Sequence, residues 1–109
     1  MTEQQTPCWW LYLLDCDGRL YTGISTDPSR RLREHQQGGS RGARFTRAAR
    51  AVTLCWQVPV GSRSLALRAE YRLRRWPRAD KLALISAAPA PAQLLIQLGL
   101  GAIDQGTSE

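Results

Sequence analysis

Several side chains in this sequence have the chemistry that phosphodiester cleavage requires. Arg31 and His35 stand four residues apart, so a helix would place both on one face. His35 is the only histidine in the chain, and imidazole titrates near neutral pH, which makes it a candidate general base. Cleavage also needs a cation against the growing negative charge and a carboxylate that holds a metal ion. Arginine and glutamate side chains of one basic stretch could supply both.

Glu70 is the carboxylate that best suits this use. It is one of two acids in the segment from Ser62 to Lys81, which also contains seven basic residues. A surface ion pair with Arg74, four residues later, would contribute only about 0.3–0.5 kcal/mol. An acid beside the apolar stripe of a helix, and not opposite to it, indicates a functional use.

The basic residues are confined to one stretch of the chain. All fifteen lie between Arg19 and Lys81, where only four acids occur, so this stretch has a formal net charge of 15 − 4 = +11. Fourteen of the fifteen are arginines, whose planar guanidinium matches phosphate oxygens. Codon bias would explain arginine in place of lysine but not the confinement, so nucleic acid is the favoured partner. The residues expected to contact it are Arg30, Arg33, Arg41, Arg44, Arg47 and Arg74.

A β-hairpin near the start of the chain would bring two tyrosines together. Two apolar runs flank Asp17-Gly18, a pair that favours a two-residue turn with positive φ angles. Such a turn pairs Tyr12 with Gly23 and puts Tyr12 and Tyr21 on one face as diagonal neighbours. Gly23 would leave a gap opposite Tyr12 that is open to a substrate or to a neighbouring element.

Asp27-Pro28 predicts the start of a first helix. Aspartate caps free N–H groups, and proline suits the first helical position. The helix would run to about Gln37 and end at Gly38-Gly39. The Gly- and Arg-rich stretch that follows is expected to be a flexible basic loop.

Three more elements are expected after this loop. Alternating apolar residues predict a strand over 52–58. A helix over about 64–75 would be capped by Ser62 or Ser64, and Pro77 would separate it from a last helix. Its apolar stripe consists of Ala66, Ala69, Leu73 and Trp76. The order β-β-α-β-α-α indicates an α+β domain, a three-stranded antiparallel sheet flanked by helices.

The chain divides into a polar N-terminal tail at 1–8, a domain at 9–87, and a Pro/Ala linker with a C-terminal tail at 88–109. The apolar LLIQL run in that tail is expected to pack back on the domain, and a protein-partner motif is the alternative. No apolar run is long enough to span a bilayer, and no signal-peptide pattern is present, so a cytoplasmic protein is expected. The cysteine spacing predicts free thiols within strands.

Taken together, these motifs resemble the GIY-YIG nuclease superfamily, in particular its small single-domain bacterial members. Trp10-Leu11-Tyr12 and Tyr21-Thr22-Gly23 correspond to the two triplets on the first two strands. Arg31 follows Tyr21 by ten residues, His35 lies one helical turn later, and Glu70 lies on the later helix. The FTR run at 45–47 also matches, and the resemblance covers roughly residues 9–86.

The resemblance implies a metal-dependent endonuclease that hydrolyses phosphodiester bonds, and the first hypothesis for its substrate is DNA, with single-stranded or branched DNA as the candidate forms. It implies a single Mg²⁺ or Mn²⁺ ion held by Glu70 and waters, with Arg31 on the scissile phosphate. Tyr12 and Tyr21 would orient or activate the water, and the base would be Tyr21 or His35. A second hypothesis is a non-catalytic nucleic-acid-binding module with the same fold, and a third is an adaptor for an acidic protein.

Two positions depart from the family pattern. Trp10-Leu11 replaces Gly-Ile in the first triplet, and a lysine that some members carry after the second triplet is Ile24 here. Only Tyr12 carries a hydroxyl in the first triplet, so we do not expect the replacement of Gly-Ile by Trp10-Leu11 to affect activity. Because this lysine is absent, we expect Tyr21 and His35 to carry more of the proton transfer.

Overall fold

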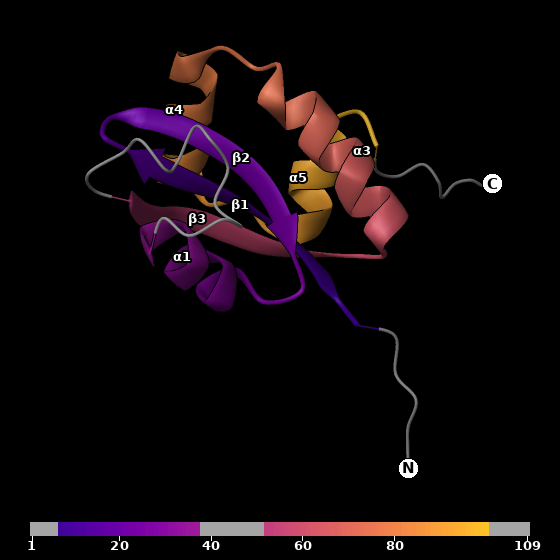
Figure 1. The fold of residues 1–109 in the computed structure, drawn as a ribbon. Helices are drawn as coiled ribbons and strands as arrows, with labels where there is room; N and C mark the ends of the chain where they lie inside the picture. Colours follow the sequence, from indigo (N-terminus) through magenta and orange to yellow (C-terminus); the bar gives the residue numbers. More distant parts are fainter. Residues whose placement is uncertain (1–6, 38–51, 101–109) are drawn as a thin grey trace, which may run out of the picture.

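The computed structural model describes residues 7–37 and 52–100, which form a sheet with helices packed around it (Figure 1). In chain order the elements are β1 (Trp9–Cys16), β2 (Arg19–Ser25), α1 (Pro28–Gln37), β3 (Val52–Gly61), α3 (Arg63–Arg74), α4 (Arg78–Ala87) and α5 (Pro91–Gln97). The predicted order and the α+β class are confirmed, with α5 as a further helix. The expected Gly38-Gly39 helix stop and the basic loop lie outside the described residues.

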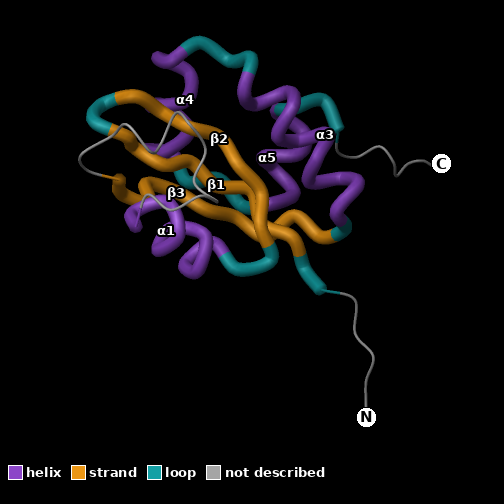
Figure 2. The backbone as a smooth tube through the Cα atoms, in the orientation of Figure 1, coloured by secondary structure: helices purple, strands orange, loops and turns teal. Residues whose placement is uncertain are grey.

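Strand β1 is the centre of an antiparallel sheet with the order β2-β1-β3 (Figure 2). In this strand Leu11, Leu13 and Leu14 are each 0% exposed, and Tyr12 is 2% exposed. A strand that is covered on both faces reads as a continuous apolar run, without polar alternation. The WWLYLL segment therefore marks the central strand.

The β1–β2 turn has the geometry that the sequence predicts. Asp17 and Gly18 have φ angles of 55° and 90°, and the Asp15 carboxylate accepts a hydrogen bond from the Gly18 N–H at 2.6 Å. This turn sets the register that pairs Tyr12 with Gly23. A slip by one residue would have moved every side chain of β2 to the other face.

A β-bulge in β3 divides its apolar residues between the two faces of the sheet. Leu14 pairs with Leu54 but Leu13 pairs with Trp56, so Cys55 is the extra residue. Leu54 consequently packs on the same face as Tyr12, whereas Trp56 packs on the opposite face. The simple alternation expected over 52–58 is therefore wrong, because it would have kept all four apolar side chains on one face.

Each face of the sheet has its own core. On one face Tyr12, Leu14 and Cys16 pack with Leu32 of α1. On the other face, Leu11 and Leu13 pack with side chains of α3, α4 and α5. The stripe of α3 is confirmed by the burial of Ala66, Ala69 and Leu73, and Trp76 packs against them while half-buried.

Polar caps define where the first two helices begin. The Asp27 carboxylate accepts the Arg30 N–H at 3.2 Å, as predicted for an N-cap. For α3 the cap is Ser62, whose hydroxyl accepts the Leu65 N–H at 3.1 Å. The alternative, Ser64, lies inside the helix.

The segment after Ala88 contributes to the core of the domain. Helix α5 buries Leu94 completely, and Leu98 just beyond it is 3% exposed. Both side chains join the cluster that packs on α3. The LLIQL run thus packs back on the domain as expected, although as a helix that the sequence analysis did not anticipate. Residues 101–109 of the expected tail lie outside the described part.

Gly99 ends α5 in a conformation that suits glycine. Its φ is +77°, and the N–H groups of Gly99 and Leu100 donate to the carbonyls of Ile96 and Leu95. A Cβ at this position would stand 2.9 Å from Nη1 of Arg72, which donates to the Leu98 carbonyl. We expect Gly99→Ala to lower the free energy of unfolding by about 1–2 kcal/mol. Urea denaturation would measure it, and an unchanged midpoint would contradict it.

The three cysteines are free thiols, but they do not all lie in strands. Cys16 is buried in β1 and Cys55 is half-buried in β3, as predicted. Cys8 is exposed and precedes β1, so the expectation fails for this residue. Within the described residues, none of the helices is long and apolar enough to cross a membrane.

Candidate active site

Four of the predicted site residues come together from four different elements. Tyr12 lies on β1, Tyr21 on β2, Arg31 on α1 and Glu70 on α3. The charges of the other three all act on the Tyr12 hydroxyl, and those of Arg31 and Glu70 act on Tyr21. The fold thus assembles two phenols, a guanidinium and a carboxylate at one place.

The ring of Tyr12 lies directly over Gly23 on the neighbouring strand. A Cβ at Gly23 would stand 2.5 Å from the Tyr12 hydroxyl oxygen and 2.6 Å from Cζ. The expected gap opposite Tyr12 is therefore filled by the ring of Tyr12 itself, and is not open to a substrate. Tyr12 is only 2% exposed, so glycine allows its hydroxyl to lie beside the sheet at a fixed place.

Burial keeps both phenols protonated at neutral pH. It raises the pKa of Tyr12 from 10.0 to about 12, and the charge of Tyr21 adds to this rise. Arg31 opposes the rise through its charge and through a hydrogen bond with the phenol. Burial also raises the pKa of Tyr21, while Arg31 lowers it. As neutral phenols, both tyrosines can donate hydrogen bonds to an oxyanion or to a water.

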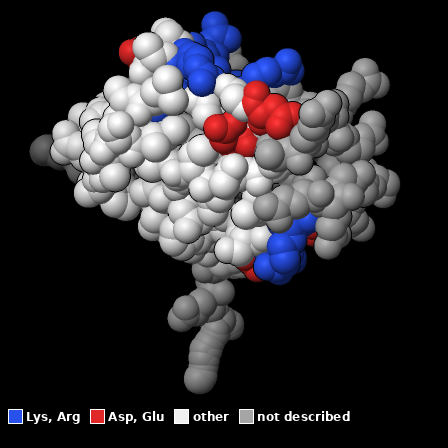
Figure 3. All heavy atoms as spheres, turned by 90° about the vertical axis from the view of Figure 1, so that its left-hand side faces the viewer, with Lys and Arg blue, Asp and Glu red and all other residues white. Residues whose placement is uncertain are grey.

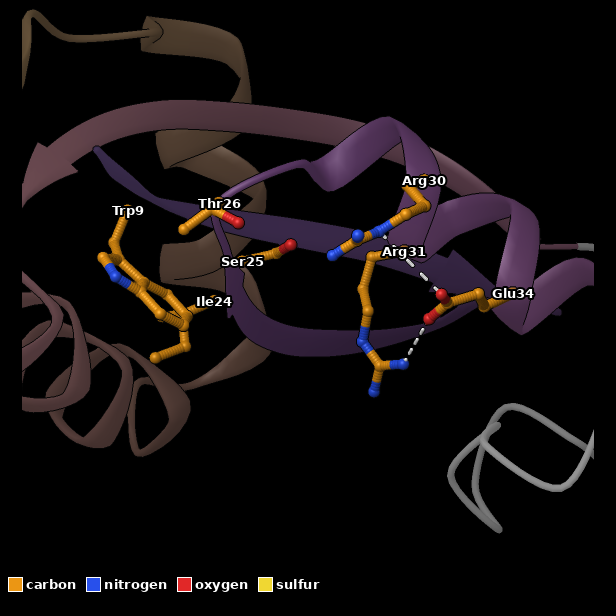
Figure 4. Close-up of a pocket in the computed structure, with 7 residues that line it drawn as sticks. All are labelled: Trp9, Ile24, Ser25, Thr26, Arg30, Arg31 and Glu34. Carbon is orange, nitrogen blue, oxygen red and sulfur yellow. Dashed lines mark hydrogen bonds and ion pairs between the residues drawn. The ribbon is translucent and has the colours of Figure 1, made fainter. Parts of the chain in front are cut away.

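Arg31 is held in place by Glu34, a residue that the sequence analysis did not single out. Arg31 Nη1 donates to Glu34 Oε1 at 2.9 Å, and Arg30 Nε lies 3.9 Å from Glu34 Oε2 (Figure 4). Desolvation lowers the pKa of Arg31, but the Glu34 hydrogen bond and the nearby tyrosines outweigh it, and the pKa rises overall. The i, i+3 spacing was the signal that could have identified Glu34.

The start of α1 is anchored to the end of β2. The Ser25 hydroxyl accepts the Asp27 N–H at 2.9 Å, and Asp27 in turn caps the helix. Ser25 is 5% exposed, so this link is shielded from water. It sets the position of the first helical turn, from which Arg31 extends.

A hollow of about 360 Å³ lies beside Arg31. Its lining residues are Trp9, Ile24, Ser25, Thr26, Arg30, Arg31 and Glu34 (Figure 4). Trp9 and Ile24 form one end and the two arginines the other, so the hollow offers an apolar wall and a cationic wall. Ile24 also packs against the core on the opposite face of β2 from Tyr21.

Among the described residues, the charge of Glu70 is only partly offset by its surroundings. Desolvation raises the pKa of Glu70, and the charge of Arg74 only partly offsets this. Within the described part of the chain, Glu70 forms no ion pair with Arg74 at 4.0 Å or less. A half-buried carboxylate without an ion pair lowers the free energy of unfolding. The alternative role of Glu70, as half of a surface ion pair with Arg74, therefore does not explain its position.

The other predicted residues are placed less fully. His35 lies in α1, and its side chain is outside the part of the chain that the structure describes. Arg33 and Arg74 are exposed, and the loop residues Arg41, Arg44 and Arg47 lie outside the described residues. On the face shown in Figure 3, described basic side chains gather in an upper and a lower group, with acidic side chains next to both.

We expect Gly23→Ala to lower the free energy of unfolding by about 1–3 kcal/mol, because its methyl group would overlap the packed Tyr12 ring. Urea denaturation of the variant and the wild type measures the change. In a Tyr12→Ala background the same substitution should cost much less, since the ring is then absent. An equal cost in both backgrounds would show that the contact with Tyr12 is not the cause.

Comparison with known proteins places this arrangement in a family. A family model described as the GIY-YIG catalytic domain matches residues 8–83. The UPF0213 protein YhbQ of Escherichia coli O139:H28 is 45% identical over 91 residues, which is 83% of this chain and 89% of that protein. YhbQ of Shigella boydii serotype 18 gives the same values.

A solved structure is also similar. The solution NMR structure of the UPF0213 protein BH0048 from Bacillus halodurans is 33% identical, with a TM-score of 0.47. The match covers 84% of this chain and 96% of that one. The family model spans the hairpin with both tyrosines, the helix with Arg31 and the helix with Glu70. On the sequence match, this chain belongs to the GIY-YIG catalytic-domain family.

Proposed function

We propose that this protein is a metal-dependent endonuclease that hydrolyses phosphodiester bonds in DNA. The observation that supports this most strongly is the convergence of Tyr12, Tyr21, Arg31 and Glu70 from four elements. The phenol of Tyr12 is buried, the guanidinium of Arg31 is held by Glu34, and the carboxylate of Glu70 is partly desolvated. These groups match the parts that phosphoryl transfer to water requires.

Glu70 is the residue that would hold the metal ion. Among the described residues, no three His, Cys, Asp or Glu side chains are placed so that they could hold a metal ion together, which disfavours a closed zinc or calcium site. Mg²⁺ binds through one or two carboxylates and keeps several waters, so a single carboxylate fits it. When bound, the ion would supply positive charge against the phosphate oxygens.

Arg31 would bind the scissile phosphate. Its guanidinium offers five N–H donors, of which one donates to Glu34 and another is hydrogen-bonded with the Tyr12 phenol. The remaining donors can reach phosphate oxygens while Glu34 keeps the side chain oriented. Arg30, on the rim of the same hollow, would contact a neighbouring phosphate.

The tyrosines would position the attacking water. Tyr12, with a pKa of about 12, stays protonated and serves as a hydrogen-bond donor, not as a base. Tyr21 and His35 remain the two proposals for the base, although Tyr21 could accept a proton only in its ionised form, which burial disfavours. A pH–rate profile separates them, because His35→Ala should remove the acidic limb of the profile if His35 is the base, whereas Tyr21→Phe should leave that limb unchanged.

The experiment is a cleavage assay on labelled single-stranded, duplex and branched DNA and on a matched RNA. Each substrate is incubated with the protein in Mg²⁺, Mn²⁺ or EDTA. We expect cleavage of DNA that depends on the metal ion. Salt-sensitive binding without cleavage on any substrate would instead support the alternative, a nucleic-acid-binding module that retains the nuclease fold.

A further inference from the structure

A second hollow, of about 380 Å³, lies between the end of α3 and the end of α5. Its lining residues are Tyr71, Arg72, Arg75, Trp76 and Leu98. We call it the α3–α5 hollow. None of these five residues is acidic, and two of them are arginines, so its walls are aromatic and cationic.

The side chains around this hollow are held by internal contacts. The Arg75 guanidinium carbon lies 5.3 Å from the centre of the Tyr71 ring, and Nη1 of Arg75 donates to the Tyr71 hydroxyl at 3.4 Å. Arg72 Nη1 donates to the Leu98 carbonyl at 3.2 Å. Within the described residues, neither arginine pairs with a carboxylate. Two fixed positive charges therefore face solvent without a counter-ion from this part of the chain.

Tyr71 is not needed for the core. It is 56% exposed, the same as Ile96, and within the described part of the chain its hydroxyl is hydrogen-bonded with Arg75, one turn away. An exposed aromatic ring next to unpaired arginines is the combination that nucleic-acid-binding surfaces use to stack a base and to bind the adjoining phosphates.

The α3–α5 hollow lies within reach of a DNA strand that extends from the candidate active site. Tyr71 directly follows Glu70 on α3, and Arg75 lies one turn further on the same side as Tyr71. Successive helical residues point about 100° apart, so Tyr71 lies about 100° and Arg72 about 200° around α3 from Glu70. The path around the helix surface from Glu70 to Tyr71, the near edge of the hollow, is about 10 Å. One strand of DNA covers that distance in about three nucleotides.

We propose that the α3–α5 hollow binds the nucleic-acid strand a few nucleotides away from the bond that is cut. This proposal rests on the nuclease function proposed above, in that the strand enters at Glu70. Tyr71 stacks on a base, and Arg75 and Arg72 bind the flanking phosphates. The hollow contributes to affinity and not to the chemical step.

Fluorescence anisotropy in EDTA tests this without any cleavage, with labelled oligonucleotides of about 2 and about 20 nucleotides, because only the longer one spans a path of about three nucleotides. Tyr71→Ala should weaken the Kd for the long oligonucleotide about tenfold, and leave the short one unchanged. Tyr71→Phe keeps the ring and should bind as the wild type does. Arg75→Gln should reduce the slope of log K against log salt by about 0.7–0.9.

Arg68→Gln is the matched control, because Arg68 is exposed on the same helix but does not line the hollow. It should bind the long oligonucleotide more tightly than Arg75→Gln does. Thermal melts monitored by circular dichroism establish that each variant is folded. Since binding is read in EDTA, the result stands even if the protein cuts no substrate.

Two results would overturn the proposal. One is an equal Kd of Tyr71→Ala and the wild type for the long oligonucleotide. The other is that a polyglutamate peptide displaces the labelled oligonucleotide as strongly as unlabelled DNA of equal charge does, and that Tyr71→Ala and Arg75→Gln weaken peptide binding as much as DNA binding. That second result would assign the hollow to an acidic protein partner.

Discussion

Glu70→Gln should lower kcat for DNA cleavage by about 10²- to 10³-fold, because a bound metal ion contributes several kcal/mol to charge stabilisation. Glutamine has nearly the same shape but lacks the charge that would hold the ion. The free energy of unfolding should stay level or rise at neutral pH. Desolvation disfavours the charged form of Glu70, so removing that charge removes a cost. Loss of activity with undiminished stability is expected of a functional residue.

Asp80→Asn provides the matched control for this prediction. Asp80 is the other acid in the basic segment from Ser62 to Lys81, and it is exposed in the first turn of α4. It should keep the wild-type kcat and metal dependence. Steady-state cleavage over a series of Mg²⁺ concentrations and urea denaturation give the two readouts. A Glu70→Gln enzyme with wild-type kcat at every Mg²⁺ concentration would remove Glu70 from the proposed mechanism.

The second large effect concerns Arg31. Arg31→Gln should lower kcat by about 10²- to 10³-fold, the loss measured when one preorganised donor to a developing oxyanion is removed. Arg30→Gln is its closest control, since Arg30 neighbours Arg31 and also lies beside Glu34, but its side chain is 56% exposed. We expect Arg30→Gln to raise KM and to leave kcat within a few fold.

Glu34 determines how this result is interpreted. Its carboxylate holds Arg31 at 2.9 Å, so Arg31→Gln also leaves Glu34 without this partner. Glu34→Gln preserves an acceptor for Arg31 and removes only the charge. If Arg31 acts on the phosphate, the kcat of Glu34→Gln should stay close to that of the wild type, whereas the kcat of Arg31→Gln should fall. An equal loss in both variants would mean that the ion pair itself, and not contact with the phosphate, is what activity requires.

Much of the fold could be predicted because the responsible signals are local. The Asp17-Gly18 turn needs positive φ angles that few residue pairs adopt readily, and it sets the register that pairs Tyr12 with Gly23. Asp27 caps its helix through the next few residues of the chain. Short-range chemistry of this kind acts the same way in any surrounding structure.

Helix α5 and the bulge at Cys55 could not be predicted in the same way. Seven residues form a marginal helix by themselves, and α5 is stabilised by burying Leu94 against the core. The bulge shifts the register so that Leu54 and Trp56 lie on opposite faces, although their spacing suggests a shared one. Both depend on contacts with residues that are distant in the sequence.

The sequence by itself determined which side chains were available for chemistry and, through spacing, which pairs share a face. Only the tertiary structure decided that Tyr12, Tyr21, Arg31 and Glu70 meet, because they lie on four elements whose packing no local pattern encodes. It also showed that Tyr12 fills the space above Gly23. Burial then shifted the pKa values of these groups, since desolvation depends on every element that packs around them.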